Sequence, residues 1–286
     1  VPYGGGTGVM GGTVPVQGGI VLDMQRINHV LVVDPVSLTA EVEAGAILGA
    51  VESMLAEQEL MLGHDPYSVP IATVAGTIST NGVGYRASAY GPMGDQVVGL
   101  EAVLADGRVV STRSVPKYSS GPNLNHLFIG AEGSFGVITK AIIKVFRLPE
   151  MQIFSAVAFD SFEQGFNAAI EMLGVGIRPA LLDLTEEENS IRLHLLFEGF
   201  EEGVAAQENR SMRICSQAGG RPEGPGPTVA YWKTRRDSAE SYKDSALGKP
   251  RSVRWARWQS KSGFDYLHLA LPTSQVLEYR RQADKI

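Results

Sequence analysis

Short apolar runs, separated by glycine-rich turns, fill the first half of the chain. Residues 29–34 (HVLVVD) are apolar almost throughout, which predicts a buried strand, and residues 39–44 (TAEVEA) alternate as a half-exposed strand does. Residues 14–22 predict a pair of short strands. Residues 46–59 place their apolar side chains at helical spacing. The pattern therefore predicts several short strands and one helix before residue 60.

A hairpin is the clearest local signal in the chain. Asp106-Gly107 lies between the apolar runs 96–105 and 108–111, and this dipeptide favours a two-residue hairpin turn. Residues 136–146 (GVITKAIIKVF) predict a long strand, whereas residues 63–86 consist mostly of small and turn-forming residues. We expect strands on both sides of a region made of turns.

The pattern changes after Met151, where longer elements follow one another. Strands are predicted at residues 153–159, 179–184 and 192–197, and helices at residues 162–173 and 201–218. This order, strand, helix, strand, strand and helix, predicts an antiparallel sheet covered by helices, an α+β arrangement.

Weaker signals follow residue 220. The proline- and glycine-rich residues 221–227 predict a linker, residues 231–242 a helix, and residues 264–269 a strand. The last helix is expected to begin at Pro272, with Thr273 or Ser274 as its cap.

The change of pattern predicts two domains, residues 1–150 and 151–286. The chain begins inside a motif without a methionine and stops within a predicted helix. We therefore expect a piece of a longer protein that lacks the N-terminal part of the first domain and the C-terminal part of the second.

Composition excludes some classes of function. The net charge is −6, so nucleic acid is not an expected partner. No signal peptide and no run of 18 apolar residues is present, which predicts no membrane span. The single cysteine, Cys215, permits no internal disulfide and indicates a reducing compartment. We expect a cytoplasmic protein, or a peroxisomal or mitochondrial one in a eukaryote.

The glycine-rich start of the chain, residues 2–12 (PYGGGTGVMGG), is the main candidate for chemistry. Its residues Gly6, Gly8 and Gly11 match the spacing of a dinucleotide fingerprint, but Pro15 stands where that fingerprint requires a helix. The Gly-Lys-Ser/Thr of a Walker loop is absent as well. A loop whose backbone N–H groups surround a pyrophosphate remains, with a plain surface loop as the alternative.

Two further runs of small residues resemble ligand-lining segments. Residues 73–84 (TVAGTISTNGVG) alternate glycines with short hydroxyl side chains, and residues 130–138 (GAEGSFGVI) lead directly into a strand. Backbone groups and short donors of this kind can line a flat polar ring system, although a threonine-rich strand edge is the alternative. Three such runs in one domain favour one long, extended ligand.

The motifs in this order resemble those of a known flavoprotein family. They are Pro-x-Gly-Gly-Gly-Thr at 2–7, Gly-His-Asp-Pro at 63–66, Thr-Ile-Ser-Thr-Asn at 77–81, Gly-Pro-x-Leu at 121–124 and Glu-Gly-Ser-Phe-Gly-Val-Ile-Thr at 132–139. They are similar to the FAD-binding domain of the vanillyl-alcohol oxidase type. Within it, the chain resembles the branch of D-lactate dehydrogenase, glycolate oxidase, D-2-hydroxyglutarate dehydrogenase and alkylglycerone-phosphate synthase. The expected fold is that FAD-binding domain followed by part of an antiparallel-sheet α+β cap domain.

The resemblance implies a set of FAD-binding positions. The loop would hold the pyrophosphate, the second run the ribityl chain and the ring, and the third run the ring and the adenine side. The positions are Pro2, Tyr3, Gly4, Gly5, Gly6, Thr7, Gly8, Tyr67, Ser68, Thr73, Gly76, Thr80, Asn81, Gly82, Val83, Glu132, Gly133, Ser134, Gly136, Val137 and Ile138. Some relatives attach FAD to a histidine of the loop; Thr7 and Gly8 offer none, which implies non-covalent FAD.

Two further residues are candidates for catalysis. Trp232-Lys-Thr-Arg235 resembles the family's Trp-x-x-Arg, whose arginine reaches the substrate acid, with a solvated helix arginine as the alternative. His64 stands next to the ring-lining run, where it is expected to donate a hydrogen bond rather than act as a base. No metal site is predicted; the resemblance places the family's metal ligands and histidine base beyond Ile286.

Three functions follow from these expectations. The first is an FAD-dependent oxidoreductase that oxidises a D-2-hydroxy acid of the lactate or glycolate type, passes electrons to an unknown acceptor and forms a possible homodimer. The second is a transferase like alkylglycerone-phosphate synthase, which exchanges an acyl chain for a fatty alcohol without net redox change. Basic residues between 249 and 261 keep it open, with a solvated basic loop as the alternative. The third is an FAD-binding paralogue without turnover.

Overall fold

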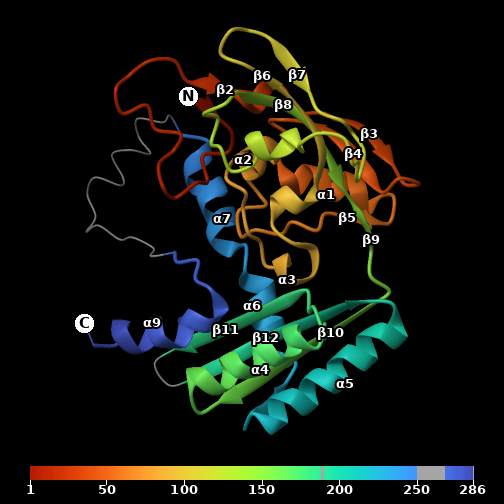
Figure 1. Cartoon of the computed structure of the whole chain (residues 1–286), viewed down its shortest axis with the longest axis vertical. Coiled ribbons are helices and arrows are strands. Elements are labelled where there is room, and N and C mark those ends of the chain that lie inside the picture. Colours follow the sequence, from red (N-terminus) through yellow and green to blue (C-terminus); the bar gives the residue numbers. More distant parts are fainter. Residues whose placement is uncertain (188–189, 250–267, 286) are drawn as a thin grey trace. The chain divides into compact units, whose positions relative to one another are not determined.

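A computed structural model describes residues 1–187, 190–249 and 268–285 (Figure 1). The chain forms two compact units, Val1–Lys243 and Asp244–Ile286. Nearly all the elements discussed below belong to the first unit. The α+β class expected from the sequence is confirmed.

The first sheet is antiparallel and has five strands in the order β3-β4-β8-β6-β7. Its strands are β3 (Val30–Asp34), β4 (Thr39–Glu43), β6 (Val97–Val103), β7 (Val109–Ser111) and β8 (Val137–Lys144). The predicted hairpin is confirmed between β6 and β7, where Gly107 has a φ of +84°. The prediction that 29–34 is buried was wrong: β3 is an edge strand, and Leu31 and Val32 are about half exposed.

Short helices and two small strand pairs complete this part. They are α1 (Leu48–Ala56), α2 (Val74–Ser79), α3 (Ala87–Tyr90), η1 (Met24–Arg26), η2 (Met93–Gln96) and η3 (Leu124–Leu127), with β1 (Pro2–Tyr3) beside β2 (Leu22–Asp23) and β5 (Leu60–Met61) beside β9 (Phe146–Arg147). The predicted helix at 46–59 is confirmed in its central part. The strand pair predicted at 14–22 was wrong, because residues 14–21 contain no strand and only Leu22 belongs to one, β2. Residues 63–86 are mostly turns as predicted, but they also contain the helix α2.

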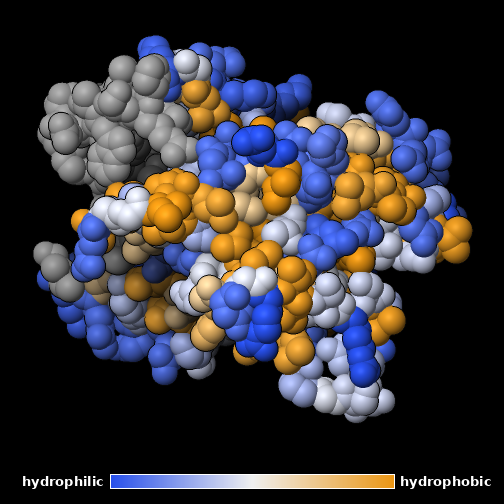
Figure 2. All heavy atoms as spheres, turned by 90° about the horizontal axis from the view of Figure 1, so that it is seen from above, coloured by the Kyte–Doolittle hydropathy of each residue, from blue (hydrophilic) through white to orange (hydrophobic). Residues whose placement is uncertain are grey.

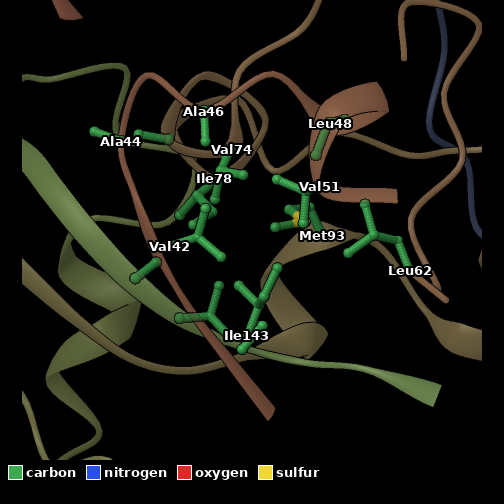
Figure 3. Packing of buried hydrophobic residues seen from close by; sticks show 14 of the residues in the cluster. Val42, Ala44, Ala46, Leu48, Val51, Leu62, Val74, Ile78, Met93 and Ile143 are labelled. Carbon is green, nitrogen blue, oxygen red and sulfur yellow. The ribbon is translucent and has the colours of Figure 1, made fainter. Parts of the chain in front are cut away.

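The core of this part lies between the first sheet and the helices α1 and α2. Val42 on β4 and Ile143 on β8 point towards Val51 on α1 and Ile78 on α2 (Figure 3), and each of the four is at most 1% exposed. Because residues from all four elements interdigitate here, the core fixes where α2 begins. That position matters for the site described below.

The second sheet is also antiparallel, in the order β11-β12-β10-β13. Its strands are β10 (Met151–Phe159), β11 (Leu181–Glu187), β12 (Ser190–Gly199) and β13 (Arg221–Gly224), and the helices α4 (Phe162–Gly174) and α5 (Glu201–Gln217) pack on it (Figure 1). The predicted strands and helices of 153–218 are confirmed. The linker predicted at 221–227 was wrong, since β13 pairs with β10.

Strand β12 separates an apolar face from a polar one. Leu193, Leu195 and Phe197 belong to the core shared with α4 and α5. His194 and Glu198 alternate with them, so they lie on the opposite face of the sheet. This opposite face packs against α6 (Gly226–Thr234) and carries the polar groups of the candidate site.

The helix predicted at 231–242 is interrupted. It forms the end of α6 and then α7 (Asp237–Tyr242), with Arg235 and Arg236 between them. Cys215 lies in the α4–α5 core, where burial raises the pKa of its thiol to about 12, as expected for a structural cysteine. One hydrophobic core lies between residues 24 and 145 and another between 157 and 215, while a domain boundary near 150 stays a prediction.

The second unit is described in part. η4 (Lys243–Leu247) leads into it, and η5 (Thr273–Gln275) and α9 (Val276–Ala283) follow residue 268. The predicted cap was wrong: Pro272 precedes η5 and Gln275 precedes α9, and neither side chain caps its helix. Most of the predicted strand 264–269, and most of the basic residues of 249–261, lie outside the described residues. Where the chain is described, no helix has the length and apolarity needed to cross a membrane.

Candidate functional site

The glycine-rich loop at the start of the chain lies directly against the residues before α2. A Cβ on Gly4 would stand 2.2 Å from Thr73 Oγ1, and one on Gly5 would stand 2.0 Å from the carbonyl oxygen of Ile71. Only glycine permits this approach of the two backbones. The loop and the start of the second small-residue run are therefore neighbours in space.

The third run adjoins both of them. A Cβ on Gly133 would stand 2.7 Å from Cγ of Pro2, and the backbone N–H of Glu132 donates to the carbonyl oxygen of Ser79 over 3.0 Å. Glu132 also lies beside Gly12, where a Cβ would meet its Oε2 at 2.1 Å. The three runs, far apart in the sequence, thus lie side by side.

The second run starts and ends with side-chain hydrogen bonds. Thr73 caps α2 by accepting from the backbone N–H of Gly76 over 3.3 Å. Beyond the helix, Asn81 has a φ of +47°, and its Oδ1 accepts from the N–H of Gly94 over 2.9 Å. Tyr67 reaches the loop itself, where its hydroxyl lies 3.4 Å from the carbonyl oxygen of Thr7. These bonds fix the backbone next to the loop.

Part of the third run lines a cavity together with the start of the chain. Ser134, Gly136 and Val137 line a cavity of about 530 Å³ with Pro2, on the side of β6 and η1. The side chain of Ile138 is only 4% exposed and belongs to the core, so its main chain alone is left for a ligand.

The face seen from above in Figure 2 carries several groups of apolar side chains. In the loop that follows the glycines, Met10, Val16 and Ile20 are mostly exposed.

His64 is buried beside Gly82 of the second small-residue run. Its side chain is 2% exposed, and neither ring nitrogen has a hydrogen-bond partner in the described part of the chain. Burial lowers the pKa of the imidazole to about 4, against an opposite effect of Asp65. A Cβ on Gly82 would stand 3.3 Å from Nε2. His64 is therefore a neutral imidazole beside the ring-lining run, with a donor and an acceptor to offer.

Three arginines bind the neighbouring carboxylate of Asp65, which is fully buried. Nη1 of Arg86 lies 3.2 Å and Nε of Arg235 3.0 Å from Oδ2, and Nε of Arg236 lies 3.0 Å from Oδ1. Charge-assisted bonds of this kind are the strong ones in proteins. Asp65 therefore joins the loop before α2 to the segment between α6 and α7.

Two further carboxylates balance the charges of this cluster. Glu198 on β12 accepts from Nε of Arg86 over 2.9 Å, and Glu52 on α1 accepts from Nη1 of Arg236 over 2.8 Å. Three acidic groups thus face three guanidinium groups. Sequence reasoning missed Arg86, Glu52 and the pairing role of Asp65, because the residues of the cluster come from five separate segments.

Arg235 is held on two sides. Its guanidinium lies 3.8 Å from the centre of the Trp232 ring, and its Nη1 donates to the Trp232 carbonyl oxygen over 2.7 Å. Nε and Nη2 are both 3.0 Å from Asp65 Oδ2. Burial lowers the pKa of this guanidinium, while Asp65 acts in the opposite direction. Of its five N–H donors, these contacts engage three and leave two.

A cavity of about 300 Å³ lies between the ring-lining run and the second sheet. Pro66, Tyr67, Val83, Gly84 and Tyr85 form one side of it, and Leu181, Leu182 and Asp183 of β11 form the other. Arg235 does not line this cavity. Asp65 adjoins the cavity wall, because a Cβ on Gly84 would stand 2.7 Å from the carbonyl carbon of Asp65.

Asp183 is a charged residue in the wall of this cavity. A chain of contacts leads from it through Tyr231 and His194 to Thr228. The hydroxyl of Tyr231 donates to Asp183 Oδ2, and the Tyr231 ring stacks on His194 with 4.5 Å between ring centres. His194 Nδ1 lies 3.0 Å from the hydroxyl oxygen of Thr228. Sequence reasoning missed this group, although the alternation of RLHLLFE places His194 on the polar face of its strand.

Comparison with known proteins identifies the family. Residues 1–113 match the family described as FAD binding domain. The chain is 34% identical over 188 residues to glycolate oxidase subunit GlcD of Bacillus subtilis, and 35% identical over 221 residues to D-lactate dehydrogenase of Archaeoglobus fulgidus. The chain belongs to the FAD-linked oxidase family.

The same family includes a similar solved structure. Alkyldihydroxyacetonephosphate synthase matches 84% of this chain with a TM-score of 0.73 and 25% identity. The GlcD alignment covers 65% of this chain and the D-lactate dehydrogenase alignment covers 71%. The chain itself spans only part of these relatives: 40% of GlcD, 49% of the D-lactate dehydrogenase and 52% of the synthase.

The residues of this chain fit the cofactor of the family. In the described part of the chain, the backbone N–H groups from Gly5 to Gly8 donate to no acceptor, although Gly5 is buried. Such a loop can receive an anionic pyrophosphate. His64 adds two unpartnered ring nitrogens where a flat polar ring is expected. Non-covalent binding of FAD is typical of this family.

Proposed function

We propose that this chain is part of an enzyme that oxidises a D-2-hydroxy acid of the lactate or glycolate type. When bound, FAD would supply the acceptor for the hydride that leaves the substrate carbon bearing the hydroxyl group, at N5 of the flavin ring. The hydroxyl proton leaves to a base, the product is the 2-oxo acid, and a separate acceptor removes the electrons. The family and its relatives GlcD and D-lactate dehydrogenase support this choice.

The cofactor is assigned to the three adjoining runs. The loop from Pro2 to Gly8 would bind the pyrophosphate through its N–H groups. The segments Tyr67–Thr73 and Thr80–Val83 would line the ribityl chain and the ring, and Glu132–Ile138 would contact the ring and the adenine side. The contacts between these runs support the assignment. The lowered pKa of His64 keeps its imidazole neutral at physiological pH. In this form it would give the flavin ring a hydrogen bond.

The cavity of about 300 Å³ is the observation that carries the proposal. It has room for a small molecule, and one of its sides is the run assigned to the ring. Arg235 does not line the cavity itself but binds Asp65, which adjoins the cavity wall. It is the proposed partner of the substrate carboxylate, because Trp232 and Asp65 hold its planar guanidinium group and leave two N–H donors.

The test is anaerobic reduction of the flavin-loaded protein. D-lactate or glycolate is expected to remove the flavin absorbance near 450 nm rapidly, while L-lactate leaves it nearly unchanged. A spectrum unchanged by each of a panel of 2-hydroxy acids contradicts the proposal. Such a result, with FAD bound, leaves the transferase and the paralogue without turnover as the two alternatives.

A transferase of the alkylglycerone-phosphate synthase type is the second candidate. The likeness to the solved structure of alkyldihydroxyacetonephosphate synthase favours it. The discriminating assay offers the protein an acylated ketone phosphate and a radiolabelled fatty alcohol. Label in an ether product, without reduction of the flavin by hydroxy acids, selects the transferase.

A further inference from the structure

Asp183 is the charged residue in the wall of the 300 Å³ cavity. It lies on β11 opposite His194 of β12, on the sheet face turned away from α4 and α5. One of its carboxylate oxygens accepts the hydroxyl of Tyr231. A carboxylate offers about four lone-pair positions, so this bond leaves acceptor capacity on Asp183.

The residues behind Tyr231 hold its ring in place. The hydroxyl of Thr228 donates to the carbonyl oxygen of Ser155 over 2.8 Å, so its oxygen accepts from Nδ1–H of His194. This bond fixes the tautomer and the plane of the imidazole, on which the Tyr231 ring stacks at an interplanar angle of 10°. His194 thus orients the Tyr231 ring by stacking on one of its faces, and the Tyr231 hydroxyl donates to Asp183.

The neighbouring ring of Tyr85 closes the arrangement. It meets Tyr231 edge-on, with 6.1 Å between ring centres, and it lines the same cavity as Asp183. Two aromatic contacts and one hydrogen bond therefore restrict Tyr231. A carboxylate held in this way on a cavity wall resembles a prepared acceptor more than a solvated surface charge.

We propose that Asp183, positioned by Tyr231, binds the hydroxyl group of the substrate. The inference rests on the proposed function and adds to it the residue that recognises the hydroxyl. Asp183 accepts a hydrogen bond from a hydroxyl and repels a carboxylate, whereas Arg235 has the opposite preference. Recognition of the hydroxyl group by Asp183 is thus distinct from recognition of the carboxylate, which is proposed for Arg235.

The experiment compares two acids that cannot be oxidised at the α-carbon. 2-Hydroxy-2-methylpropanoate has no α-hydrogen, and 2-methylpropanoate lacks the hydroxyl as well. Isothermal titration of the flavin-loaded protein measures both dissociation constants without any turnover. We expect the hydroxylated acid to bind about tenfold tighter to the unmodified protein, because its hydroxyl bonds a charged acceptor.

Two variants locate the origin of that difference. In D183N the tenfold ratio should fall to about two or less, and in Y231F it should fall in part, because the carboxylate remains but loses its orientation. E187Q is the matched control: Glu187 lies on the same strand and face, four residues further, and does not line the cavity. It should keep the full ratio.

The outcomes separate the inference from the function on which it rests. A full ratio in D183N overturns the role of Asp183, even if flavin reduction by hydroxy acids is retained. Equal binding of both acids by the unmodified protein overturns it too. If neither acid binds and no hydroxy acid reduces the flavin, the proposed function itself fails.

Discussion

Arg236 and Asp65 join the segment between α6 and α7 to the loop before α2. Nε and Nη2 of Arg236 both contact Oδ1 of Asp65, while Nη1 and Nη2 bind both carboxylate oxygens of Glu52. The guanidinium is thus shared by two carboxylates, which together raise its pKa despite burial. This link fastens the segment between α6 and α7 to Asp65, which adjoins one wall of the cavity, and to α1.

Replacing Asp65 should destabilise the protein strongly. D65N leaves three guanidinium groups without their common buried partner, and loss of one member of a buried pair costs about 3 to 5 kcal/mol. Urea unfolding measures the free energy. D160N is the control, since Asp160 pairs with Arg221 at the surface and such pairs contribute little. Equal losses in both variants contradict the role of Asp65.

Burial of His64 should make stability fall in mild acid. Its pKa is lowered from 6.5 to about 4 in the folded state, so the unfolded chain binds more protons between these values. The contribution of neutral His64 is present above pH 6.5 and is lost as the pH falls towards 4, by up to about 3 kcal/mol.

H64L should remove this part of the pH dependence. Free energies of unfolding at pH 7 and pH 5, with FAD at saturation, measure it. H126Q is the control, because His126 is exposed on η3. A slope in H64L as steep as in the unmodified protein would show that His64 is not buried neutral.

Arg235 and Arg236 should differ in what their replacement changes. R235K keeps the charge but loses the planar fork proposed for the substrate carboxylate, so the KM for the hydroxy acid should rise about tenfold or more. R236K should leave KM nearly unchanged and lower the stability, because Arg236 binds Glu52 and Asp65. Steady-state kinetics and urea unfolding of both variants test this. The reverse pattern would assign the substrate to Arg236.

The sequence predicted elements whose stability is local. The hairpin at Asp106-Gly107, strand β12 and helices α4 and α5 carry clear periodic patterns, and each lies where the pattern indicates. α2 was missed because threonine, glycine and valine are poor helix formers. It is stabilised by the cap at Thr73 and by core contacts of Val74 and Ile78, which no local pattern reveals.

The candidate site was predictable only where one segment carries its own signal. The glycine loop and the run at 73–84 were recognised from their residues. The Asp65 cluster was not, because Arg86 and Arg236 reach it from 21 and 171 positions away. The same holds for Asp183 and Tyr231, which are 48 positions apart and meet only through the pairing of β11 with β12 and the packing of α6.

The affinity of two glycine variants for FAD tests the central claim most directly. A Cβ on Gly5 would collide with the carbonyl oxygen of Ile71 at 2.0 Å, whereas one on Gly8, in the same loop, would meet nothing within 4 Å. Fluorescence titration of the flavin-free protein measures both dissociation constants, and circular dichroism checks folding. G5A is predicted to bind FAD at least tenfold more weakly and G8A about as tightly as the unmodified protein. Unchanged FAD affinity in a folded G5A would contradict the claim that this loop, packed against the residues before α2, binds the cofactor.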